Sequence, residues 1–206
     1  MNGKLSSLYF ISQETPNYSH LELLDIVTQY GVKLVQLRLK DIPLNEVYDT
    51  AEKAKFICKR NGAILILNDY LQVASDLDLD GVHLGKEDAS HVDARKLLGK
   101  NKIIGRTANS LDDVLALETE HIDYIGLGPF SFTTTKKNLS PILGLDGYRK
   151  IAKSRKTKIP IYAIGGITLK DILPLSKIVE GIAVSGLLAN APNIPATIQT
   201  IQNILD

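Results

Sequence analysis

Short runs of apolar residues recur along the chain, separated by segments in which apolar and polar positions follow a helical spacing. The runs are rich in Val, Ile and Leu and lack the strict alternation of a half-exposed strand. Continuous apolar runs of this length are typical of parallel strands that are buried on both faces. The pattern therefore predicts eight parallel strands, within residues 8–12, 33–40, 63–69, 81–85, 102–108, 124–129, 159–166 and 181–186.

Amphipathic segments fill the intervals between these runs, and each predicts a helix that packs against the sheet. The chain has 206 residues for eight strand–helix units. An open, doubly wound sheet of eight strands would have few residues left for its edge loops, whereas a closed (β/α)8 TIM barrel can be built from units of this length. We therefore expect a single α/β domain over residues 1–206. Residues 138–145 form a longer loop after the sixth strand, placed to cover a site. The clearest helical segments are Leu44–Arg60, Ala89–Leu98, Ser110–Glu118 and Asn193–Leu205.

Composition and charge narrow the class of protein. Hydrophobic residues make up 44% of the chain and charged residues 23%, as in ordinary folded domains. The net charge is +1 and Lys and Arg are spread along the sequence, which predicts neither a nucleic-acid-binding stripe nor a basic membrane anchor. No apolar run approaches the ~20 residues that span a bilayer, and no signal peptide is evident. We expect a cytoplasmic protein without nucleic-acid or membrane partners, and the sequence leaves open whether it forms a homo-oligomer.

Polar residues at the strand ends are the first candidates for function, because the active site of such barrels lies at the C-terminal ends of the strands. Gln36, Arg38 and Lys40 alternate at the end of the second strand, so a strand that continues through them points all three the same way. Cations directed into a barrel are costly to bury unless they meet an anion. Arg38 and Lys40 are therefore candidate anion ligands, and ion pairs with neighbouring carboxylates are the alternative.

Carboxylates follow the third and fourth strands. Asn68 and Asp69 end the run AILILND, and Glu87 and Asp88 follow GVHLG. Adjacent strand ends thus offer one carboxylate each, and Mg²⁺ is commonly held by one or two carboxylates together with water and phosphate oxygens. The alternative is that Asp69 and Asp88 cap the helices that follow them. His83, inside the fourth strand, is interpreted as a hydrogen-bonded core residue.

Residues suited to phosphate binding follow the last three strands. The sixth strand leads into TTTKK, the seventh ends in AIGGIT and the eighth in AVSG. Backbone amides after strands seven and eight form the frequent phosphate site of this fold. Tight packing of the backbone is the alternative explanation for the glycines. The candidate phosphate ligands are Thr133, Thr134, Thr135, Lys136, Gly165, Gly166, Ser185 and Gly186.

Taken in order, these motifs resemble the thiamine-phosphate synthase family. The resemblance rests on QLRLKD, ILND, GVHLGKED, DYIGLGPFSFTTTKK, IYAIGGIT and GIAVSG, which lie between residues 36 and 186. AIGGI is common among phosphate-binding barrels, whereas GVHLGKED together with GLGP and TTTKK is specific. Family members are transferases that join 4-amino-2-methyl-5-hydroxymethylpyrimidine diphosphate to 4-methyl-5-(2-phosphoethyl)thiazole, or to its carboxylated form. They release pyrophosphate and form thiamine phosphate.

The resemblance also implies a role for individual residues. Asp69 and Asp88 would bind Mg²⁺, and Arg38, Lys40 and Lys136 would stabilise the departing pyrophosphate in a dissociative substitution. Two further groups of residues would bind the substrates. The pyrimidine diphosphate would be held by Gln36, Leu37, Arg38, Leu39, Lys40, Asn68, Thr107 and Lys136, and the thiazole phosphate by Thr133, Thr134, Thr135, Gly166, Ser185 and Gly186.

The chain departs from the family pattern at several positions. Thr107 and Asn109 stand where Ser and His are usual, so a hydroxyl is retained but Asn109 cannot carry a proton. Phe132 replaces a usual proline, and Ser185 with Gly186 replaces an aliphatic residue followed by Ser. Two alternative functions are a thiazole tautomerase of the same superfamily and a non-catalytic barrel that binds thiamine precursors. The ND and GKED motifs, with their carboxylates, argue against both.

Overall fold

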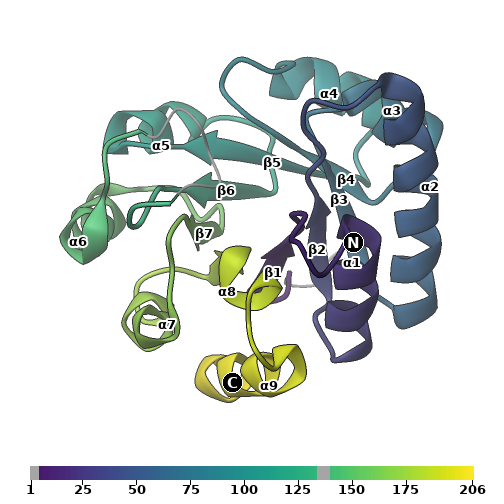
Figure 1. Cartoon of the computed structure of the whole chain (residues 1–206). Helices are drawn as coiled ribbons and strands as arrows, with labels where there is room; N and C mark the ends of the chain where they lie inside the picture. The colour runs from purple at the N-terminus through teal and green to yellow at the C-terminus, as the bar shows by residue number, and fades with distance from the viewer. Residues whose placement is uncertain (1–4, 134–139) are drawn as a thin grey trace.

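The computed structural model describes residues 5–133 and 140–206, and they form a closed barrel of eight parallel strands (Figure 1). Each strand pairs with the next one along the chain, and the last pairs with the first. The predicted TIM barrel is thereby confirmed. The strands are β1 (Leu8–Ile11), β2 (Leu34–Leu37), β3 (Ile64–Asn68), β4 (Gly81–Leu84), β5 (Ile103–Ala108), β6 (Tyr124–Leu127), β7 (Ile161–Ile164) and β8 (Gly181–Val184).

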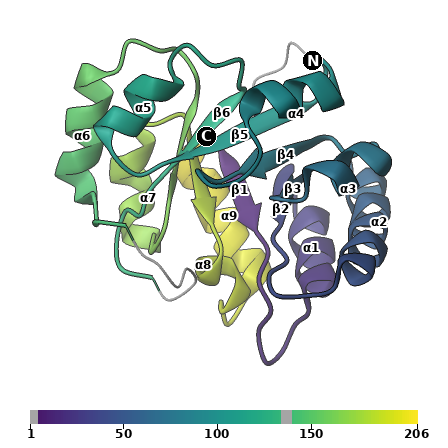
Figure 2. The same ribbon diagram turned by 90° about the horizontal axis from the view of Figure 1, so that it is seen from above.

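Helices surround the barrel, and the four whose bounds were predicted, α2, α4, α5 and α9, agree with the prediction within two residues at each end. They are α1 (His20–Gln29), α2 (Leu44–Asn61), α3 (Leu71–Asp76), α4 (His91–Leu98), α5 (Leu111–Leu117), α6 (Gly144–Ser154), α7 (Leu169–Ser176), α8 (Gly186–Ala189) and α9 (Ile194–Leu205). In Figure 2, α1 to α3 lie on one side of the strands and α5 to α7 on the other. None of the helices in the described ranges has the length and hydropathy required to cross a bilayer.

The strands divide their side chains between two apolar layers. In β1, Phe10 belongs to the core between strands and helices, whereas Tyr9 points into the lumen. Tyr9, Tyr124 and Tyr162 meet there edge to face, with ring centroids 5.4 to 5.7 Å apart, and we call them the tyrosine triangle. The lumen is thus a packed core, as is usual for this fold. We call the opening at the C-terminal ends of the strands the mouth of the barrel, and the triangle forms the floor beneath it.

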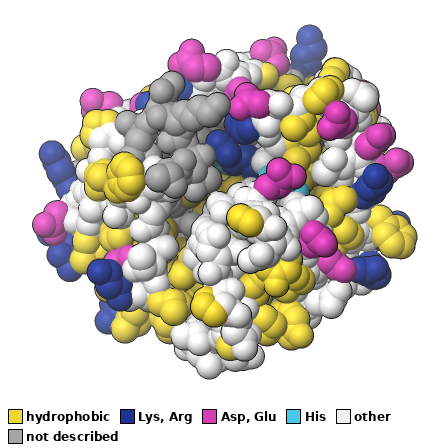
Figure 3. Space-filling view, in the orientation of Figure 1, with side chains coloured by type: hydrophobic (Ala, Val, Ile, Leu, Met, Phe, Trp, Pro, Cys, Tyr) yellow, Lys and Arg dark blue, Asp and Glu magenta, His cyan; other side chains and the backbone are white. Residues whose placement is uncertain are grey.

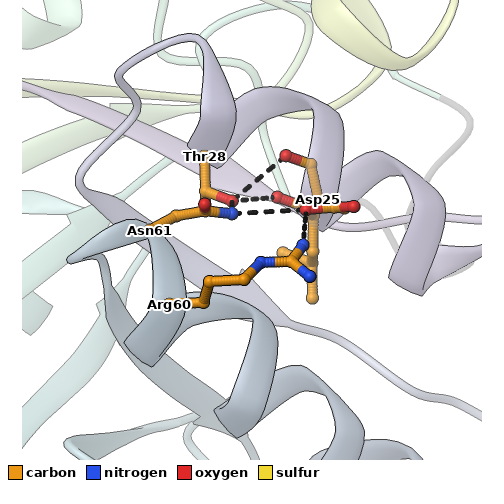
Figure 4. Close-up of polar contacts among 5 residues, drawn as sticks. Asp25, Thr28, Arg60 and Asn61 are labelled. Atoms are coloured by element: carbon orange, nitrogen blue, oxygen red, sulfur yellow. Dashed lines mark hydrogen bonds and ion pairs between the residues drawn. The ribbon is translucent and has the colours of Figure 1, made fainter.

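Polar contacts fasten α1 to α2 on the outside of the barrel (Figure 4). Nη2 of Arg60 lies 2.5 Å from Oδ1 of Asp25. The Asn61 amide donates to the same oxygen at 3.2 Å and to Oγ1 of Thr28 at 2.8 Å. Since α2 ends where the chain turns back to the start of β3, this contact lies at the end of the barrel opposite the strand C-termini and supports the scaffold.

Candidate active site

The residues predicted at the end of β2 lie at the C-terminal mouth of the barrel, although the strand is shorter than expected. It ends at Leu37, so Arg38 and Lys40 follow it rather than extend it. The alternation nevertheless continues, because Leu37 and Leu39 are buried in the outer core while Gln36 points into the lumen. Any contact of Leu37 or Leu39 with a substrate would therefore have to come from the backbone.

Arg38 is a half-buried cation whose guanidinium has no hydrogen bond or ion pair within the described chain. Only its backbone N–H is engaged, donating to Oγ of Ser12 at 3.1 Å. Burial lowers the pKa of Arg38, and the nearby carboxylates of Asp69 and Asp41 oppose this shift. Lys40, in contrast, forms an ion pair with Asp69, so the ion-pair alternative holds for Lys40 alone. Figure 3 shows basic and acidic side chains meeting near the centre of one face, beside the grey residues.

The two predicted metal ligands come together at this mouth. Asp69 has a φ of 68°, and its N–H donates to the carbonyl of His83 at 2.9 Å, which fixes the end of β3 against β4. Oδ2 of Asp88 accepts a hydrogen bond from the N–H of Gly85 at 2.6 Å. Burial raises the pKa of Asp69, Asp88 raises it further, and the ammonium of Lys40 opposes both. Three carboxylates, of Asp41, Asp69 and Asp88, meet two cations, of Arg38 and Lys40, so the group retains excess negative charge that suits a metal cation.

Neither carboxylate caps a helix, so the capping alternative is wrong. The N-cap of α3 is Tyr70, which makes no side-chain cap, and α4 is capped by Ser90, whose Oγ accepts from the N–H of Asp93 at 3.1 Å. No group of three or more His, Cys, Asp or Glu side chains suited to a metal occurs in the described parts of the chain. A metal held by Asp69 and Asp88 would need further oxygens from water or a ligand, which is how Mg²⁺ is usually bound.

A row of hydrogen bonds connects the mouth to the floor, and we call it the lumen chain. Thr107 Oγ1 lies 2.9 Å from His83 Nε2, and His83 Nδ1 lies 3.0 Å from the Tyr124 hydroxyl. That hydroxyl is 2.8 Å from the Tyr9 hydroxyl, to which the Gln36 amide donates at 2.7 Å. The interpretation of His83 as a hydrogen-bonded residue is confirmed. The part of Tyr9 and Tyr124 was not foreseen, because they lie within apolar runs that read as plain strand.

The loop after β6 runs along the end of β7. The N–H groups of Phe130 and Ser131 donate to the carbonyls of Ile164 and Gly165 at 2.8 and 2.9 Å. Of the hydroxyl and lysine cluster predicted here, Thr133 lies within the described residues. The rest of the cluster falls outside them: Thr134, Thr135 and Lys136.

The contact between the loop after β6 and the end of β7 requires a glycine at position 166. Its φ is 67°, a conformation that side chains disfavour. A Cβ added there would stand 2.4 Å from the carbonyl oxygen of Phe132 and 2.8 Å from that of Ser131. The packing explanation for Gly166 therefore has direct support. Its approach to a phosphate stays a prediction.

After β8, the side chain and the backbone of Ser185 face different partners. Its Oγ lies 2.9 Å from Oε1 of Gln13, and its carbonyl accepts from the N–H groups of Leu188 and Ala189. Gly186 begins α8, and the N–H groups of Gly186 and Leu187 have no hydrogen-bond partner among the described residues. These amides, rather than the Ser185 hydroxyl, are the donors available to a phosphate at this position.

Comparison with known proteins identifies the family. The family model for thiamine monophosphate synthase matches residues 8–188. The chain belongs to this family. A thiamine-phosphate synthase of Bacteroides fragilis is 46% identical over 202 residues, covering 96% of this chain and 99% of the relative. The thiamine-phosphate synthase of Flavobacterium johnsoniae is 41% identical, covering 97% of this chain and 96% of the relative.

Solved structures agree with this placement in the thiamine monophosphate synthase family. A thiamine phosphate pyrophosphorylase from Pyrococcus furiosus superposes with a TM-score of 0.84 at 30% identity, covering 97% of this chain and 95% of that one. A 3-hexulose-6-phosphate synthase, with a TM-score of 0.69 at 15% identity, shares the fold alone. As a member of the thiamine monophosphate synthase family, the chain is an enzyme of the transferase class.

Asn109 joins the loops at the C-terminal ends of the strands by hydrogen bonds. Its Nδ2 donates to the carbonyl of Gly128 at 2.5 Å, and its N–H donates to Asp113 at 2.7 Å. Asp113 also pairs with Lys86 at 2.6 Å. The loops that follow β4, β5 and β6 are thereby linked. This role was not foreseen, since nothing in the sequence brings Lys86, Asn109 and Gly128 together.

Proposed function

We propose that this enzyme couples hydroxymethylpyrimidine diphosphate to thiazole phosphate, giving thiamine phosphate and pyrophosphate. The observation that carries the proposal is the half-buried guanidinium of Arg38, which forms no hydrogen bond or ion pair with another described residue and lies near Asp69, itself a neighbour of Asp88. A site that combines a guanidinium whose N–H groups form no hydrogen bond to a described residue with oxygen ligands for a metal suits a metal-bound diphosphate. Membership of the thiamine monophosphate synthase family supports the same reaction.

The two substrates would occupy neighbouring sectors of the mouth. The loops after β2 to β5 would hold the pyrimidine diphosphate, and those after β6 to β8 the thiazole phosphate. The first group comprises Gln36, Leu37, Arg38, Leu39, Lys40, Asn68, Thr107 and Lys136, and the second Thr133, Thr134, Thr135, Gly166, Ser185 and Gly186.

Asp69 and Asp88 would hold Mg²⁺. The fit rests on their mutual repulsion, which raises the pKa of Asp69 and which a dication would relieve. When bound, the metal would neutralise negative charge on the diphosphate. Lys40 already pairs with Asp69, so its ammonium group would lie beside the negatively charged diphosphate that the metal binds.

The protein residues would stabilise charge and position the reactants, without a nucleophile of their own. The C–O bond to the diphosphate breaks with its electron pair on oxygen, leaving a cation delocalised over the aminopyrimidine. Arg38, Lys40 and Lys136 would stabilise the departing oxygens by charge. The thiazole nitrogen, held through its phosphate, then supplies the electron pair of the new C–N bond. No proton needs to be transferred in these two steps.

The proposal is tested by pyrophosphate release. We expect release when both substrates and Mg²⁺ are present, and little when the thiazole phosphate is left out or EDTA is added. Mass spectrometry should detect thiamine phosphate in equal amount. Release that is equally fast without thiazole phosphate would indicate a hydrolase, and no release in any mixture would reject the proposed reaction.

We expect Gly166→Ala to raise the KM values of both substrates and to lower the melting temperature by several degrees. The added methyl group would displace the loop after β6, at a free-energy cost of about 1–3 kcal/mol. Gly62→Ala is the control, because Gly62 also has a positive φ, of 62°, but the nearest atom to an added Cβ is Nζ of Lys33 at 4.0 Å. A rise in KM confined to the thiazole phosphate, with unchanged melting, would instead favour direct phosphate approach.

A further inference from the structure

The lumen chain has a direction that follows from counting its hydrogens. The amide nitrogen of Gln36 can only donate, so the Tyr9 oxygen accepts from it. The single hydrogen of the Tyr9 hydroxyl must then go to Tyr124, the other group that it contacts. Burial raises the pKa of both phenols, so each keeps its one hydrogen.

The same count continues to the mouth. Since Tyr124 accepts from Tyr9, its own hydrogen is directed to Nδ1 of His83. A neutral imidazole that accepts at Nδ1 carries its hydrogen on Nε2, and this nitrogen donates to Thr107. Because the oxygen of the half-buried Thr107 hydroxyl accepts from Nε2, and no described residue accepts its hydrogen, that hydrogen is directed to a group at the C-terminal ends of the strands.

We propose that Tyr124 and His83 are positioning residues, which hold the Thr107 hydroxyl as a hydrogen-bond donor toward an acceptor atom of the diphosphate-bearing substrate. This inference rests on the proposed function for the identity of that substrate. Its structural core is the order Gln36 to Tyr9 to Tyr124 to His83 to Thr107, in which each group donates to the next. If the Gln36 amide were turned so that its oxygen faced Tyr9, every bond would reverse and Thr107 would present an acceptor instead.

The tyrosine triangle supplies a matched control within the same lumen. The ring of Tyr162 contacts those of Tyr9 and Tyr124, with centroids 5.6 and 5.4 Å away. Its hydroxyl, however, donates to the carbonyl of Ser6 at 2.7 Å and takes no part in the lumen chain. Tyr162→Phe and Tyr124→Phe therefore each remove one buried hydroxyl from the triangle, but only the second interrupts the chain.

The direct test is the tautomer of His83, measured by nitrogen-15 NMR of the full-length enzyme without substrate, with its signals assigned by their loss in His83→Gln. We expect hydrogen on Nε2 in the wild type and in Tyr162→Phe, and a mixture of tautomers in Tyr124→Phe. Hydrogen on Nδ1 in the wild type would overturn the inference. An unchanged tautomer in Tyr124→Phe would overturn the role of Tyr124.

The second measurement is steady-state kinetics with both substrates. Tyr124→Phe should lower kcat/KM for the pyrimidine diphosphate about tenfold, the usual effect of one misdirected hydrogen bond, and leave the KM of the thiazole phosphate unchanged. Tyr162→Phe should remain within about twofold of the wild type. Equal losses in both variants would show a merely structural role. The NMR result does not depend on turnover, so a failure of the proposed reaction would leave the direction of the chain separately testable.

Discussion

Asp69→Asn and Asp88→Asn should each lower magnesium-dependent turnover on the order of a hundredfold, the typical loss when an electrostatic group at a developing charge is removed. The two carboxylates converge from the ends of β3 and β4, and each Asn keeps the size of the side chain but removes its charge. Folding should not suffer. Burial and Asp88 already disfavour the charged form of Asp69, so the melting temperature of Asp69→Asn should equal or exceed that of the wild type.

The measurement is pyrophosphate release as a function of magnesium concentration, beside thermal melting of each variant. Asp76→Asn, at the other end of α3 from Asp69, is the control, because the carboxylate of Asp76 is exposed and bonds to Gln72 and Tyr48. It should keep normal turnover. Wild-type rates in both Asp69→Asn and Asp88→Asn would remove these residues from the mechanism.

Arg38→Met should be comparably severe, again on the order of a hundredfold, without disturbing the fold. The guanidinium has no described partner, so its removal leaves no buried group unsatisfied, and the Met side chain retains much of its apolar stem. Calorimetric titration with pyrophosphate and magnesium offers a readout separate from turnover and should show weaker binding.

Arg149→Met serves as the control for Arg38, since Arg149 is an exposed residue of α6 paired with Asp146 at 3.1 Å. It should bind pyrophosphate normally. If Arg38→Met retains wild-type pyrophosphate affinity and turnover, the guanidinium of Arg38 has no part in binding the diphosphate.

The sequence predicted the barrel well because a strand that is buried on both faces appears in the sequence as a continuous apolar run. It also predicted that Asp69 and Asp88 would lie at the same edge of the sheet, since parallel strands end at one edge. Asp69 and Asp88 illustrate this, being nineteen positions apart yet neighbours in the structure.

What the sequence did not predict depends on contacts between distant segments. Tyr9 and Tyr124 each look like ordinary strand residues, and only closure of the barrel brings their hydroxyls within 2.8 Å. The bond from Asn109 to Gly128 joins two loops in the same way. The side chain of Ser185 likewise finds Gln13 because β1 closes against β8.

The tyrosine triangle also determines how ligands can enter and leave the barrel. The three tyrosine rings fill the lumen, so the barrel is open to ligands only at the C-terminal ends of its strands. A molecule that binds there must also leave there. The two substrates, the pyrophosphate and the coupled product would all share that single entrance. Release of the pyrophosphate and of the coupled product would therefore both depend on the same loops at the C-terminal ends of the strands.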